Sequence, residues 1–144
     1  MDRIYSSVSS WLGLLLALVA MAGCENAPSA ADIKEATRVR GTWEFVSLRG
    51  GMPEDRETEQ QLSGELVLSS DSSFTYESGS SGNNGWHESG QGRWEVKDGV
   101  VMLHYQERNG SPYSNVARFE ILRDELILNP SDQAFVFVFA KTQP

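Results

Sequence analysis

The chain has a single cysteine, Cys24, among its 144 residues. One cysteine excludes an internal disulfide, so an exported domain would have to be stable through packing alone. Its sulfur is a buried thiol, a reactive group, a ligand or an attachment point. The two histidines, His87 and His104, stand at no metal-ligand spacing from it. We therefore expect no metal site and no cofactor.

Basic residues are scarce, because 12 lysines and arginines stand against 20 acidic residues and give a formal net charge of −8. Such a chain repels phosphate backbones, which excludes nucleic acid as a partner. No serine lies in a Gly-x-Ser-x-Gly pattern, and the glycine-rich segment 78–92 leads into an expected strand, not into a helix N-terminus. We expect a protein that is not an enzyme.

No apolar run is long enough to span a bilayer comfortably. The longest, Trp11–Gly23, follows Arg3 and ends in small residues, as an export signal does. Two cleavage sites compete at its end. Ala20-Met21-Ala22 fits an ordinary signal site, whereas Met21-Ala22-Gly23-Cys24 resembles the bacterial lipobox, in which the cysteine becomes the first residue and its sulfur carries a diacylglycerol.

We expect the lipobox cleavage, between Gly23 and Cys24. Residues 1–23 are then a lipoprotein signal peptide that is removed, and Cys24 is the lipid attachment site, carrying acyl chains such as palmitate. The predicted location is the bacterial cell envelope. Glu25 stands where enteric bacteria place an aspartate for inner-membrane retention, which favours the outer membrane.

Residues 24–40 are polar and rich in alanine, which predicts a tether between the lipid and the domain that follows. Its second half favours a short helix, since Ser29 and Asp32 suit a helix start and Gly41 suits a stop. A helix this short needs a surface to pack on.

From Gly41 onward, apolar residues recur at every second position, which is the strand signal. Short turn sequences such as Lys97-Asp98-Gly99 separate the alternating segments. Consecutive short strands can bury one face by curling into a closed barrel. The sequence therefore predicts an all-β domain over residues 41–141, an up-and-down barrel of eight antiparallel strands, with a two-sheet sandwich as the alternative.

The first expected strand opens with Gly41-Thr42-Trp43, and "LVLSSDSSFTYES", "GRWEV", "DGVVMLHY" and "LRDELIL" follow in order. Together, over about residues 41–140, these segments resemble the bacterial lipocalin-like domains, small calycin-type barrels often carried on lipoproteins. Gly-x-Trp is similar to the lipocalin signature. The resemblance implies a lipocalin-like barrel that holds a small apolar ligand.

The expected inner face bears on whether such a barrel has room for a ligand. Ten aromatic rings lie on it, joined by at least seven aliphatic side chains, and each ring buries roughly 150 to 250 Å². This inventory favours a packed core over a ligand-sized cavity. Six of these residues are candidates for core or pocket wall: Trp43, Phe45, Tyr76, Trp94, Tyr105 and Phe137.

Two outer surfaces are also predicted. Trp86 and His87, in the segment 78–92, are candidates for a flap over one end of the barrel. The first and last strands become neighbours when the barrel closes, and their outward residues would form one apolar stripe that a partner binds, unless Ile33 and Val39 cover it. The stripe consists of Val46, Leu48, Val136 and Val138.

Two functions of different classes remain. The first, which the resemblance favours, is a membrane-anchored envelope lipoprotein whose barrel binds a small apolar ligand without catalysis. The second is a structural or interaction lipoprotein with a solid barrel core that contacts another envelope protein.

Overall fold

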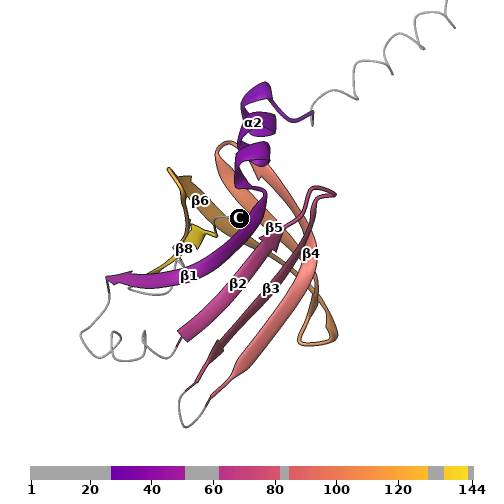
Figure 1. Cartoon of the computed structure of the whole chain (residues 1–144). Helices are drawn as coiled ribbons and strands as arrows, with labels where there is room; N and C mark the ends of the chain where they lie inside the picture. Colours follow the sequence, from indigo (N-terminus) through magenta and orange to yellow (C-terminus); the bar gives the residue numbers. More distant parts are fainter. Residues whose placement is uncertain (1–26, 51–61, 82–84, 130–134, 143–144) are drawn as a thin grey trace, which may run out of the picture.

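The computed structural model describes residues 27–50, 62–81, 85–129 and 135–142. Within these ranges the chain forms one helix and a closed barrel of antiparallel strands (Figure 1). The predicted signal peptide, with Gly23 and Cys24, lies outside the described residues. No helix in the described ranges is long and apolar enough to cross a membrane.

Every strand pairs antiparallel with the next in sequence, and β8 returns to pair with β1. The predicted eight-stranded up-and-down barrel is therefore confirmed, and the sandwich alternative is wrong because the sheet closes on itself. The elements are α2 (Ala30–Val39), β1 (Gly41–Gly50), β2 (Leu62–Leu68), β3 (Ser73–Ser80), β4 (His87–Lys97), β5 (Val100–Arg108), β6 (Ser111–Leu122), β7 (Glu125–Leu128) and β8 (Phe135–Lys141).

Two hairpins turn on a pair of residues that both have positive φ. These pairs are Asp98-Gly99, at 53° and 76°, and Asn109-Gly110, at 51° and 74°. A turn with two residues in the left-handed conformation matches the twist of the flanking strands. The sequences Asn-Gly and Asp-Gly adopt this conformation most readily. The second turn lets β5 and β6 run up to it from both sides.

One end of the barrel, here called the closed end, holds the densest packing. Alternation places one set of apolar side chains inside on all the strands, as predicted. The buried core cluster comprises Val39, Trp43, Leu66, Leu68, Phe74, Trp94, Val96, Val101, Leu103, Phe119, Leu126 and Phe139.

Helix α2 covers the closed end (Figure 1). Ser29 is its N-cap and forms a capping box with Asp32, which satisfies backbone donors at the first turn. At the other end of the helix Val39 is fully buried, and the Trp43 indole donates a hydrogen bond of 2.7 Å to its carbonyl oxygen. The helix of the predicted tether is thus a part of the packed barrel.

The predicted apolar stripe does not form, because β1 contains a β-bulge. The pairing with β8 shifts register between Phe45 and Ser47, so Val46 is an extra residue on β1. The shift turns Leu48 to the barrel interior, opposite Phe137, and leaves Val46 exposed on the outside.

The β8 half of the stripe is also covered. Arg49 on β1 and Glu125 on β7 form an ion pair of 2.7 Å that crosses β8. Arg49 pairs with Val136 of β8, and Glu125 pairs with Ala140 of the same strand. Val138 lies between these two positions of β8, so the ion pair passes over it. The Val138 side chain is fully buried. Ile33, a predicted cover, is 56% exposed. Of the four stripe residues, Val46 alone is an exposed apolar side chain.

All the described elements and the whole core cluster lie between Ala30 and Lys141. A chain that starts at Glu25 therefore contains the complete barrel with its covering helix.

Candidate functional site: a cavity in the open end of the barrel

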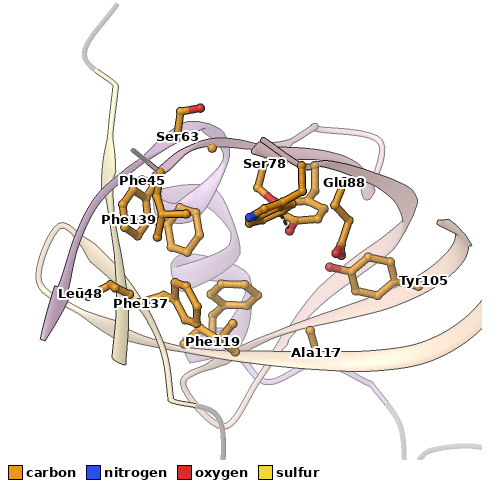
Figure 2. A pocket seen from close by; sticks show the side chains of 15 residues that line it. Phe45, Leu48, Ser63, Ser78, Glu88, Tyr105, Ala117, Phe119, Phe137 and Phe139 are labelled. Carbon is orange, nitrogen blue, oxygen red and sulfur yellow. Dashed lines mark hydrogen bonds between the residues drawn. The ribbon is translucent and has the colours of Figure 1, made fainter. Parts of the chain in front are cut away.

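The end of the barrel opposite α2, here called the open end, is hollow. A cavity of about 430 Å³ lies between the strands there (Figure 2). Its wall consists of Phe45, Leu48, Leu62, Ser63, Gly64, Tyr76, Ser78, Trp86, Glu88, Tyr105, Ala117, Phe119, Leu128, Phe137 and Phe139.

The expectation of a packed core is wrong for the open end. It was based on the number of aromatic rings on the inner face of the barrel and left out the small residues on that face. Gly64, Ser78 and Ala117 occupy inward positions on β2, β3 and β6. At the closed end β2 and β3 place Leu66, Leu68 and Phe74 inside. The barrel is therefore filled at one end and hollow at the other.

One wall of the cavity is formed by phenylalanines from β1, β6 and β8. Phe45 packs edge-to-face against Phe137 and Phe139, with ring centroids 6.3 Å and 6.0 Å apart. Phe119 meets Phe139 in the same manner at 5.7 Å. Such pairs fix each other's orientation, so this wall is preformed and apolar.

The facing wall carries the polar groups, on β3, β4 and β5. Glu88 points into the cavity and forms an ion pair of 2.7 Å with Arg108, with 24% and 40% of the two side chains exposed. The Tyr76 and Ser78 hydroxyls share a hydrogen bond of 2.5 Å. Figure 2 shows Glu88 and Tyr105 on this side, away from the phenylalanines.

Both tyrosines of the polar wall are held in the neutral form. Burial raises the pKa of the Tyr105 hydroxyl, and the nearby Tyr76 and Glu88 act in the same direction. Burial also raises the pKa of Tyr76, against the hydrogen bond from Ser78. Within the described part of the chain, the Tyr105 hydroxyl makes no hydrogen bond to another residue. The cavity thus contains an uncharged hydroxyl that a ligand can reach.

The six candidates for core or pocket wall divide between the two ends. Phe45, Tyr76, Tyr105 and Phe137 line the cavity. Trp43 and Trp94 are 1% and 4% exposed and belong to the core cluster of the closed end. Each of these indoles donates a hydrogen bond to a backbone carbonyl, Trp94 to that of Ser69 at 2.9 Å. They form the floor of the barrel and not the cavity wall.

The predicted flap is mostly strand. β3 extends to Ser80 and β4 starts at His87, so only the short connection between them is outside the sheet. Trp86 in this connection lines the cavity and is 47% exposed, whereas the His87 side chain is exposed outside the barrel. Gly90 of this segment permits close packing, since a Cβ there would lie 2.7 Å from the Tyr105 ring.

Sequence reasoning missed Glu88 as a cavity residue. It assigned Trp86 and His87 to a flap and did not consider that the residue after His87 would face the opposite side of a strand. Counting back from Trp94 in steps of two gives Gly92, Gly90 and Glu88, all on the inner face of β4. This count would have identified Glu88 as an inward residue.

The arrangement offers apolar contacts and hydrogen-bonding groups that can bind a ligand. In the described residues no cluster of three metal-ligating side chains is present. His104 pairs with Glu95 at 2.9 Å on the outer face, remote from the cavity lining.

Comparison with known proteins gives no further assignment. No protein-family model matches the chain, and no curated protein is similar to it at a significant level.

Proposed function

We propose that the chain is a membrane-anchored envelope lipoprotein whose lipocalin-like barrel binds one small apolar ligand without catalysis. The observation that carries the proposal is the hollow open end of the barrel. Cavities of 300 to 1,000 Å³, roughly, with mainly apolar walls and a few polar groups are typical of small-molecule sites. The cavity here, about 430 Å³ with five polar side chains in its wall, falls within that range.

The geometry of the wall supports reversible binding of a ligand that enters from the open end. The phenylalanine wall is preformed, so little side-chain order has to be gained on binding. Trp86 lies in the wall next to the connection between β3 and β4 and remains partly exposed. A ligand in the cavity therefore changes the surroundings of this indole.

Cys24 precedes Ser29, the N-cap of α2, by five positions. A coil of this length would reach about 12 Å. Because α2 covers the closed end of the barrel (Figure 1) and the cavity is at the other end, the proposed anchor would lie on the side of the closed end. In a lipid-anchored protein the cavity would thus open away from the bilayer that holds it.

Intrinsic fluorescence tests the binding proposal, because the chain from Glu25 onward has three tryptophans and Trp86 alone lines the cavity. We expect a saturable change in emission on titration with small apolar compounds. Trp86→Phe should abolish it, and Trp94→Phe at the closed end should preserve it. Native mass spectrometry of the same sample should show one ligand per chain.

The second candidate is a structural or interaction lipoprotein with a solid barrel core. The cavity at the open end argues against it, because that end of the barrel is not solid. Absence of any bound compound in both measurements would contradict ligand binding and leave interaction with another envelope protein.

A further inference from the structure

The charge distribution in the cavity bears on the ligand's headgroup. Among the described residues that line it, Glu88 is the single carboxylate and there is no lysine or arginine. Arg108 is engaged with Glu88 and lies outside the lining. A carboxylate ligand would therefore meet a like charge in a partly desolvated site, which is costly.

The geometry of the ion pair sets the polarity of this wall. Arg108 donates to the Oε2 atom of Glu88 at 2.7 Å, and the guanidinium is also placed 5.3 Å from the centre of the Tyr113 ring. Glu88 lines the cavity, whereas Arg108 is not part of the lining. The second carboxylate oxygen of Glu88, Oε1, makes no hydrogen bond or ion pair with another described residue. The pair presents an acceptor to the cavity, while its net charge is zero.

The hydroxyls beside this acceptor complete the headgroup site. Tyr105 is on β5 and Glu88 on β4, the neighbouring strand, and both line the cavity. The Tyr105 hydroxyl can donate to or accept from a ligand, and so can the Tyr76–Ser78 pair. The opposite wall, made of phenylalanines, offers only apolar contact.

We propose that the ligand is an amphiphile with an uncharged hydroxyl headgroup, which donates to Glu88 and exchanges a hydrogen bond with Tyr105 while its apolar chain lies against Phe45 and Phe137. This inference rests on the proposed function and specifies its ligand class. It disfavours free fatty acids, because their carboxylate would lose its hydration in a cavity whose described lining contains the Glu88 carboxylate and no cation. It also disfavours ammonium headgroups, because a Glu88 carboxylate already paired with Arg108 attracts them too weakly to offset the cost of their dehydration.

Three probes with the same apolar chain test the inference: dodecanol, dodecanoic acid and dodecylamine. Their dissociation constants are measured at neutral pH with the chain from Glu25 onward, by displacement of a fluorescent apolar dye. We expect dodecanol to bind tightest, with a preference of about tenfold or more over dodecanoate. Equal or tighter binding of dodecanoate, or tightest binding of dodecylamine, would overturn the inference.

Two glutamates on β4 provide a matched pair of variants. Glu88→Gln should strengthen dodecanoate binding by about tenfold, since it removes the repulsion and frees Arg108. Glu95→Gln, which removes an equivalent charge paired with His104 on the outer face, should leave all three affinities unchanged. The wild-type comparison stands even where a variant fails to fold. Binding of none of the probes, or of any other apolar compound, would contradict the proposed function itself.

Discussion

Gly92 is the residue at which β4 accommodates its neighbours most tightly. A Cβ there would clash with the His104 carbonyl oxygen on β5 and would lie 2.9 Å from the Phe74 ring. The pairing of β4 with β5 also shifts register next to it. Only glycine fits at position 92, because a side chain would not fit between the β5 backbone and the Phe74 ring.

Gly92→Ala should therefore lower the free energy of unfolding by about 3 kcal/mol, the upper part of the range for overpacking. Gly99→Ala is the control. Gly99 has a φ of 76° and open space around it, so its cost comes from the backbone alone, about 1 kcal/mol. Urea denaturation measures both, and equal costs would contradict the steric account.

Tyr105 couples the stability of the barrel to alkaline pH. Burial raises the pKa of its hydroxyl above the ordinary value of 10.0, so the folded state favours the protonated phenol. A raised pKa gives stability that is fully present below the ordinary pKa and is lost as the pH rises above it. The free energy of unfolding should therefore fall above pH 10.

The difference in unfolding free energy between about pH 9 and about pH 11, on either side of the ordinary tyrosine pKa, measures this effect. Tyr105→Phe should make the difference smaller than in the wild type, because it removes the titrating group. An unchanged difference would show that the buried hydroxyl does not couple folding to pH.

Among the elements, α2 is the one whose sequence signals and structure agree most closely. Ser29, Asp32 and the stop near Gly41 mark its ends in both. Ser29→Ala should lower the free energy of unfolding by about 1 kcal/mol, since it removes the cap. Thr37→Ala, which removes a hydroxyl bonded to the Ile33 carbonyl on the exposed side, should cost less than half of that. Similar losses at both sites would mean that α2 does not depend on its cap.

The strands were predicted from alternation, and alternation explains both the success and the errors. It placed Trp43, Tyr76 and Trp94 inside correctly, because every step of two returns to the same face. It failed at Leu48, where a β-bulge adds one residue to β1 and reverses the faces beyond it. A bulge depends on pairing with β8, which is distant in sequence, so the local pattern does not reveal it.

The cavity was missed for a different reason. Its volume depends on which inward residues are small, and on where along the barrel axis they meet. Gly64, Ser78 and Ala117 come from three strands, and only the pairing register brings them to the same end. Residue counts summed over the whole inner face cannot distinguish an evenly filled barrel from one with a packed floor and a hollow end.

At the scale of the whole molecule, the cavity lies at the end of the barrel opposite α2, the helix that follows the proposed anchor residue Cys24 in the sequence. Cys24→Ala should shift the protein from the membrane fraction to the soluble fraction. Its unfolding free energy should stay the same, because the core cluster lies between Val39 and Phe139. Fractionation and immunoblotting with unchanged membrane association would instead support cleavage after Ala20-Met21-Ala22 or an uncleaved anchor.

The central claim is that the open end of the barrel holds a ligand, and filling the cavity tests it most directly. Ala117 lines the cavity, while Val116, the preceding residue of β6, is on the outer face and 42% exposed. The measurement is the dissociation constant of an apolar dye for the wild type, Ala117→Phe and Val116→Phe. We predict a loss of about tenfold or more in affinity for Ala117→Phe and wild-type affinity for Val116→Phe. Equal affinity of the two variants, with both folded, would contradict a ligand site in the cavity.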